Sequence, residues 1–265
     1  MIQSNNPALG VFQQPARWSD LESGVKDRSV MTLQGTINAT GVLLGLCAAS
    51  ALAAVTWAGP FLGMVTFGGF IVGFILALVI IFNPRSAQFL SPVYAILMGA
   101  ALGGISMWYQ TWASGQASST GSTSTVAQIG DSIVFQAVLL TFGIAGAMLL
   151  AYSLRIIRAT PMFVRVVSIM VIGYFLAAIS TWILRLLGAG VPFLHEMGPL
   201  GILIAGGVVV LAALTLIIDF KRIEDGVQTG APKWMEWYGA FGLMVTLVWL
   251  YLRVLHLLAL LRRND

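Results

Sequence analysis

Charged residues are scarce in this chain: Asp, Glu, Lys and Arg together make up only 9% of its 265 residues. Globular proteins average about a quarter charged residues. Hydrophobic residues instead make up 58% of the chain. A soluble core cannot bury so much apolar surface, so lipid must be the solvent for most of the chain. The composition excludes an ordinary water-soluble domain and predicts an integral membrane protein.

Reactive side chains are also scarce. The single cysteine, Cys47, excludes an internal disulfide, and the two histidines, His195 and His256, lie on different predicted elements. The chain has no His-x-x-x-His, no paired cysteines, no Gly-x-Ser-x-Gly and no phosphate-binding Gly-rich loop with a lysine. The apolar stretches also lack the paired aspartates that an intramembrane protease would need. We therefore expect no enzyme activity, no cofactor and no resident metal ion.

The first 30 residues lack the basic start, apolar stretch and cleavage site of a signal peptide. We expect residues 1–30 to form a cytoplasmic tail, followed by an uncleaved first membrane helix and one membrane domain over residues 31–265. That domain has seven apolar stretches near the roughly 20 residues that a spanning helix needs. We predict an all-α bundle of seven transmembrane helices at about Ile37–Trp57, Phe61–Phe82, Leu90–Trp112, Ile133–Tyr152, Val164–Leu187, Leu200–Phe220 and Tyr238–Leu261.

Positive charge is distributed unevenly between the predicted loops. Of the 14 Lys and Arg residues, ten lie in the N-terminal tail and in alternate loops, and the other loops contain none. Arg262 and Arg263, at the C-terminus, are the exception to this pattern. The positive-inside rule therefore predicts a cytoplasmic N-terminus and a C-terminus on the far side of the membrane.

An aspartate, Asp219, ends the sixth apolar stretch. A helix shows its small residues to its neighbours, so a small-residue face that includes Asp219 would point this carboxylate into the bundle. The alternative is a solvated carboxylate at the cytoplasmic rim, beside Lys221 and Arg222. Counting back from Asp219 in threes and fours gives the mostly small face Thr215, Ala212, Val208, Ala205 and Gly201.

The seventh stretch carries a permanent charge, Arg253, near its middle. An arginine at membrane depth costs a few kcal/mol, so it normally faces the bundle interior and has a partner. Trp249, one turn earlier, could supply a cation–π contact of about 1 kcal/mol, but no counter-charge. The small and polar residues of this helix recur at spacings of three and four and therefore share one face: Gly239, Gly242, Thr246, Trp249, Arg253 and His256.

A carboxylate is needed to balance Arg253. Asp219, on the preceding helix, is the first candidate, and Glu196, in an outward loop, is the alternative. Glu236 is about 17 residues away, or roughly 25 Å along a helix, which is too far. A contact between Asp219 and Arg253 requires the seventh helix to begin below the membrane.

Glycines recur at a spacing of four residues in three of the predicted helices. Such pairs allow helix backbones to approach closely in lipid, so we expect them to mark helix–helix contacts. The pairs are Gly41 and Gly45, Gly69 and Gly73, and Gly99 and Gly103.

Three segments resemble the signature segments of the Bax inhibitor-1 family, also called the transmembrane BAX inhibitor motif family. They are "SPVYAILMGAALGGIS" (91–106), "LIIDFKRIEDG" (216–226) and "LYLRVLHLLALLR" (250–262). The opening "SNNPAL" and the segment "APKWMEWYGAFGLMVTLVWLYL" are similar to the bacterial Bax inhibitor-1-like branch.

The resemblance implies a seven-helix bundle whose last helix is enclosed by the other six, in a bacterial inner membrane. Several members are described as pH-sensitive calcium leak channels, in which an aspartate ending helix six and an acidic residue in helix seven share a proton. A basic residue after helix two can compete for that aspartate. By position, these residues correspond to Asp219, Arg253 and Arg85 in this chain.

Arg253 therefore stands where the resemblance implies a carboxylate. Two close carboxylates can hold a shared proton near neutral pH. An arginine at this position removes the pair and favours an ionised aspartate. Our hypothesis at this stage is a fixed Asp219–Arg253 ion pair that makes the protein weakly pH-sensitive or a poor conductor of Ca²⁺, a hard cation that prefers several oxygen ligands.

The favoured function is a pH-modulated Ca²⁺ leak channel in the lipid bilayer, with Asp219 as a candidate Ca²⁺ contact. One alternative is a non-conducting interaction protein, because some bacterial members are associated with membrane-anchored ATP-dependent proteases. A proton-coupled carrier of small solutes that uses Asp219 is the second alternative. Nucleic acid is not expected as a partner.

Overall fold

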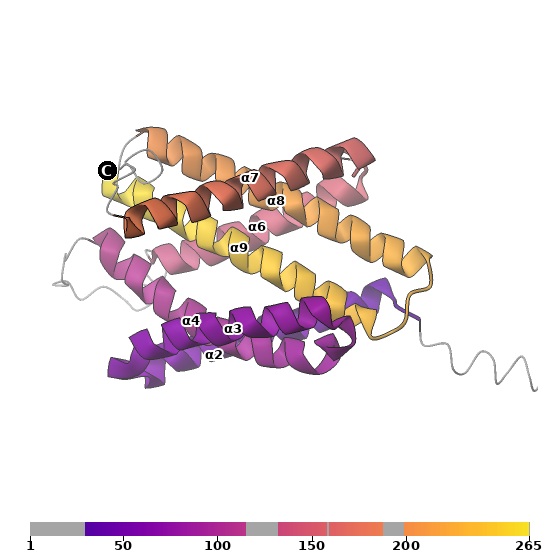
Figure 1. The fold of residues 1–265 in the computed structure, drawn as a ribbon, viewed down its shortest axis with the longest axis horizontal. Coiled ribbons are helices and arrows are strands. Elements are labelled where there is room, and N and C mark those ends of the chain that lie inside the picture. The colour runs from indigo at the N-terminus through magenta and orange to yellow at the C-terminus, as the bar shows by residue number, and fades with distance from the viewer. Residues whose placement is uncertain (1–29, 115–131, 158, 188–198, 265) are drawn as a thin grey trace, which may run out of the picture.

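The computed structural model of this chain describes residues 30–114, 132–157, 159–187 and 199–264, and these residues form seven long helices (Figure 1). Each helix is long and apolar enough to cross a membrane, so the predicted all-α, seven-span architecture is confirmed for the described residues. Two short 3₁₀ turns, η2 (Gly59–Phe61) and η3 (Pro84–Ser86), flank the second span. The helices are α2 (Leu33–Trp57), α3 (Leu62–Phe82), α4 (Ala87–Ser114), α6 (Ile133–Ser153), α7 (Pro161–Leu186), α8 (Pro199–Gln228) and α9 (Met235–Asn264).

The last helix, α9, crosses the bundle diagonally between the group α2, α3 and α4 and the group α6, α7 and α8 (Figure 1). It packs against α2, α4, α6 and α8, and it reaches α7 through the side chains of Trp249 and Arg253. The helix α3 packs mainly on α4, and α7 packs on α8. Enclosure of the last helix by all six others is therefore not confirmed.

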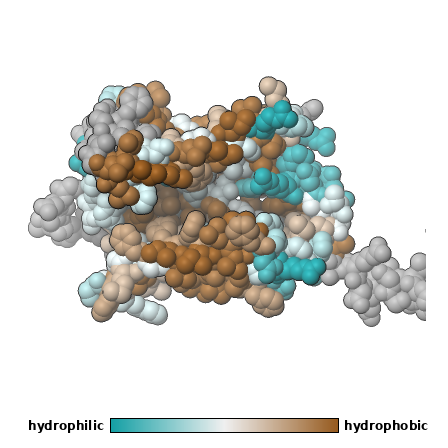
Figure 2. Space-filling model, in the orientation of Figure 1, coloured by the Kyte–Doolittle hydropathy of each residue, from teal (hydrophilic) through white to brown (hydrophobic). Residues whose placement is uncertain are grey.

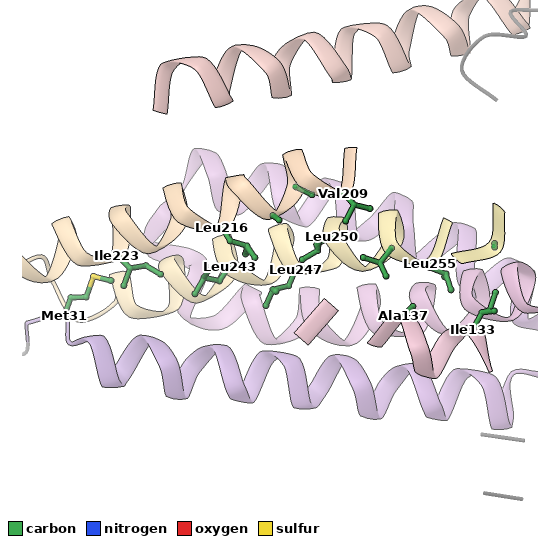
Figure 3. Packing of buried hydrophobic residues seen from close by; sticks show 14 residues of the cluster. Met31, Ile133, Ala137, Val209, Leu216, Ile223, Leu243, Leu247, Leu250 and Leu255 are labelled. Carbon is green, nitrogen blue, oxygen red and sulfur yellow. The ribbon is translucent and has the colours of Figure 1, made fainter. Parts of the chain in front are cut away.

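Two apolar clusters lie on opposite sides of α9. In one, Leu250 and Leu255 of α9 pack with Leu216 of α8 and with residues of α6 (Figure 3). In the other, Met244 and Phe241 of α9 pack with residues of α2 and α4. The ring of Phe241 meets that of Tyr94 edge-on, with their centroids 5.1 Å apart. Because both clusters include α9, this helix joins the two halves of the bundle.

The sixth span is longer than predicted. The apolar stretch ends near Phe220, but α8 continues to Gln228 because its charged extension is itself a good helix. Within that extension, Lys221 and Asp225 form an i,i+4 ion pair at 2.9 Å. The chain turns only at Gly230, whose φ of +66° is favourable for glycine. Asp219 therefore lies inside a continuous helix and not at its end.

The molecule has a broad apolar surface and one distinctly hydrophilic end. Figure 2 shows hydrophobic residues across the middle and hydrophilic residues gathered at the end where α8 finishes and α9 begins. Lys221 and Arg222 lie in the charged extension of α8, and Lys233 lies in the connection between α8 and α9. This arrangement is typical of a helix bundle whose middle is solvated by lipid.

The glycine pairs behave differently from one another. A methyl group on Gly99 would overlap the Cys47 carbonyl oxygen of α2, and one on Gly103 would lie 2.6 Å from the Ala51 carbonyl oxygen. Gly69 is similarly close to α4, at 2.9 Å from the Leu97 carbonyl oxygen. Close packing therefore explains these three glycines. It does not explain Gly41 and Gly45 of α2, which have open space around them.

This difference predicts opposite effects of alanine at two glycines. Gly99→Ala should cost about 1 to 3 kcal/mol, because the new methyl group pushes the backbones of α2 and α4 apart. Gly45→Ala should be neutral or stabilise by up to about 1 kcal/mol, because alanine favours the helix and meets no neighbour. Thermal unfolding of the two variants in one detergent checks the prediction, and equal shifts in melting temperature would contradict it.

Candidate functional site

The carboxylate of Asp219 forms a hydrogen bond between the last two helices. Its Oδ2 accepts from the hydroxyl of Thr246 on α9, with the oxygens 2.6 Å apart. Thr246 is buried and Asp219 is half-buried. Three small residues of the predicted face are buried as well, Gly201, Ala205 and Ala212. The hydrogen bond shows that Asp219 points toward α9, the direction that the small-residue face predicts, while its side chain stays partly exposed.

The expected ion pair between Asp219 and Arg253 is not formed. Neither residue has an ion-pair partner in the described part of the chain. The reason is the register of the two helices. Thr246 lies opposite Asp219, and Arg253 follows Thr246 by seven residues, or roughly 10 Å along the axis of α9. The register of α9 against α8 therefore keeps the two charges apart.

Arg253 instead lies against α7. The central carbon of its guanidinium is 5.2 Å from the ring centre of Tyr174, a cation–π contact. Trp249, which we expected to supply this contact, packs its ring against Tyr174 and Phe175. The Nε atom of Arg253 and the Nε1 atom of Trp249 are both buried without a hydrogen-bond acceptor. Tyr174 could not be singled out from the sequence, because it lies within the apolar run of residues 169–179 and belongs to no polar stripe.

Two further polar contacts join α9 to α4. The hydroxyl of Tyr109 is 3.2 Å from Nδ1 of His256, and the hydroxyls of Ser106 and Tyr251 are 2.7 Å apart. His256, a secondary candidate from the sequence, therefore faces α4, whereas Arg253 of the same stripe faces α7. Thr246, Arg253 and His256 thus contact three different helices, which are α8, α7 and α4.

Arg85, the candidate competitor for Asp219, is exposed on η3 and forms no ion pair with Asp219. The arrangement implied by the resemblance is therefore absent from this structure. Glu196, the alternative partner of Arg253, lies outside the described residues.

The carboxylate of Glu236 is deeply buried, with 6% of the residue exposed. Its Oε1 accepts from the backbone N–H of Thr32 at 2.9 Å and from the Thr32 hydroxyl at 2.8 Å. Thr32 is the N-cap of α2, so Glu236 ties the start of α9 to the start of α2. A side chain on Gly35 would overlap this carboxylate. These contacts give Glu236 a structural role that the sequence did not indicate.

Among the described residues, no group of three or more His, Cys, Asp or Glu side chains comes together to hold a metal ion. Asp219, Arg253 and His256 instead form separate contacts, and each contact joins α9 to a different helix.

Comparison with known proteins adds one finding. The family described as Bax inhibitor 1 like matches residues 5–263, which is nearly the whole chain. No curated protein and no solved structure matches.

The contacts of Glu236 predict a clear loss of stability. Glu236→Ala should cost about 1 to 2 kcal/mol, because the backbone N–H and the hydroxyl of Thr32 lose their acceptor, although water can reach the exposed Thr32. Asp225→Asn is the control. It removes a carboxylate from an exposed i,i+4 ion pair and should change stability by less than about 0.5 kcal/mol. Both are measured by thermal unfolding in detergent, and a cost for Glu236→Ala no larger than that of the control would refute the assigned contact.

Proposed function

The chain belongs to the Bax inhibitor 1 like family, and from this membership and the position of Asp219 we propose that it is a pH-modulated Ca²⁺ leak channel. In this proposal the contact between α8 and α9 keeps the path closed. The single observation that supports it is the hydrogen bond from Thr246 to Asp219, which joins two helices that are each long and apolar enough to span a membrane.

The proposed control follows from the strength of that hydrogen bond. An ionised carboxylate accepts a hydrogen bond roughly twice as strong as a neutral one. When Asp219 takes up a proton, its bond to Thr246 weakens and α8 is held less firmly against α9. Because α9 belongs to both apolar clusters, a shift of this helix affects both halves of the bundle. The leak should therefore rise as the pH falls.

This proposal replaces the earlier expectation of weak pH sensitivity. That expectation depended on an ion pair that would keep Asp219 permanently ionised, and Arg253 is about two helical turns too far away. Arg222, three residues after Asp219, is close enough to act on it electrostatically.

We also propose a bacterial inner membrane as the location, with the N-terminus in the cytoplasm. The support is the hydrophilic end of the bundle, where Lys221 and Arg222 of α8 and Lys233 of the following connection lie (Figure 2). The positive-inside rule assigns such an end to the cytoplasm.

One observation favours the second candidate, a non-conducting partner of a membrane-anchored ATP-dependent protease. Arg253 places a positive charge in the last helix, where it repels a passing cation. In that case, the purified protein would be silent in liposomes and would co-purify with a protease. The third candidate, a proton-coupled carrier, would instead show saturable, gradient-driven uptake of a solute.

We call the hydrogen bond between Thr246 and Asp219 the latch. The latch predicts the behaviour of two variants in liposomes. Thr246→Val removes the hydroxyl but keeps the carboxylate, so the Ca²⁺ leak at neutral pH should increase several-fold. Asp219→Asn removes the titrating group, so the leak should be high and independent of pH. The measurement is Ca²⁺ flux into proteoliposomes between acidic and neutral pH.

Thr215→Val is the matched control for the latch. Thr215 lies one turn before Asp219 on α8, is also half-buried, and donates its hydroxyl to the Leu211 carbonyl oxygen of its own helix. Its loss should leave the flux unchanged. A Thr246→Val flux equal to that of the wild type and of Thr215→Val would overturn the latch.

The register of α8 and α9 makes a separate prediction for Arg253→Glu. A glutamate here is roughly 10 Å along the axis from Thr246, too far to share a proton with Asp219. The variant should therefore titrate no more steeply than the wild type in the same flux assay. A markedly steeper pH profile would mean that residues 219 and 253 meet, contrary to this register.

A further inference from the structure

The hydrophilic end of the bundle, where α9 begins (Figure 2), holds a cavity of about 390 Å³. Sites for small ligands typically have volumes of roughly 300 to 1,000 Å³. The wall of this cavity is formed by the connection between α8 and α9, the first turn of α9 and the first turn of α4. The lining residues are Gln88, Pro232, Lys233, Trp234, Glu236 and Trp237.

The cavity wall carries one charge of each sign. Lys233 is exposed and has no ion-pair partner among the described residues. Glu236 accepts two hydrogen bonds from Thr32 through Oε1, and its negative charge remains at the wall. Within the described part of the chain, no hydrogen bond engages the side-chain N–H groups of Gln88 and the two tryptophans. The polar groups of this wall therefore have capacity left for a ligand.

The surface next to the cavity is apolar. Phe89 follows the lining residue Gln88 on α4, and 75% of it is exposed. Phe82, at the end of α3, is 84% exposed and is separated from α4 by the short turn η3. In a membrane-spanning bundle, acyl chains solvate such exposed rings, and tryptophans gather at the level of the headgroups. The cavity therefore lies where a phospholipid presents its polar headgroup beside its acyl chains.

We propose that the cavity binds the headgroup of a zwitterionic phospholipid, which carries one phosphate and one ammonium group. Lys233 contacts the phosphate as a point charge, and the Gln88 amide is a further donor. The ammonium group lies against an indole face and is attracted by the charge of Glu236. A headgroup with a phosphate alone would add a second negative charge beside Glu236, and Arg85 of η3, which would balance it, does not line the cavity. The inference does not depend on the proposed leak function.

The test is native mass spectrometry of the full-length protein, delipidated in detergent and mixed with one lipid at a time. The wild type should bind its first phosphatidylethanolamine molecule several-fold more tightly than phosphatidylglycerol, which has the phosphate but no ammonium group. Glycerophosphoethanolamine, the same headgroup without acyl chains, should displace the lipid only weakly. Displacement at equal concentrations would assign the cavity to a soluble zwitterion and would overturn the proposal.

Three variants separate the contributions of the wall. Lys233→Gln should weaken the binding of both lipids several-fold, because both lose the partner of their phosphate. Trp234→Leu should weaken only phosphatidylethanolamine, because it removes an aromatic face. Glu236→Gln keeps an oxygen that accepts from Thr32 but removes the charge, so the preference for phosphatidylethanolamine should disappear while the contact with α2 remains.

Two matched variants control for general effects of charge and aromatic content. Arg165→Gln removes an exposed positive charge from α7, outside the cavity, and should leave both affinities unchanged. Trp57→Leu removes an exposed indole from the far end of α2 and should do the same. Equal affinity of the wild type for the two lipids would overturn the proposal. So would losses in Lys233→Gln and Trp234→Leu no larger than those of their controls.

Discussion

The hydrogen bond between Thr246 and Asp219 shows how far α9 is displaced along α8, because it places these two residues opposite each other. The other polar contacts of α9 are consistent with this axial register. Each residue of α9 advances about 1.5 Å along its axis. With Thr246 opposite Asp219, Arg253 lies roughly 10 Å further along. Tyr251 and His256, in the same part of α9, lie beside Ser106 and Tyr109 of α4.

The magnitudes show why Asp219 cannot balance Arg253 at this distance. Two unit charges about 10 Å apart attract by roughly 2 kcal/mol at an effective dielectric constant of about 20. A charged side chain at the centre of a membrane helix costs about 2.5 to 3.5 kcal/mol even on insertion scales. The cation–π contact with Tyr174 adds about 1 kcal/mol and leaves the charge in place. The aspartate alone therefore does not offset this cost, but its attraction and the cation–π contact together come to about 3 kcal/mol, which lies within the range of the cost.

The sequence predicted the helices and their faces well because both depend on local patterns. Seven apolar stretches gave seven spans, and the small residues preceding Asp219 gave its inward direction. The predicted end of the sixth helix was wrong because the apolar stretch ends near Phe220, whereas the helix continues through Lys221 and Asp225. The hydropathy of a segment does not show where its helix ends, since a charged segment can be fully helical.

The pairing of Asp219 was not predictable for a different reason. Spacings of three and four identify the face of a helix, but they do not fix how far one helix slides along another. Both Thr246 and Arg253 lie on the stripe that was identified, and only the packing of whole helices selects Thr246. Similarly, a glycine pair does not indicate whether a neighbouring helix is present, so Gly99 is packed tightly while Gly45 is not.

On the proposed function, the separation of the two charges constrains the path of a cation. Asp219 lies in the half of α8 that runs to the hydrophilic end of the bundle (Figure 2), whereas Arg253 lies about two turns beyond Thr246 along α9. A Ca²⁺ ion attracted by the carboxylate must then pass a fixed positive charge if it continues beside α9. The resemblance implies an acidic pair that shares a proton, but in this chain residue 253 is an arginine and lies away from Asp219. Asp219 can therefore take up a proton without changing the fixed charge at Arg253.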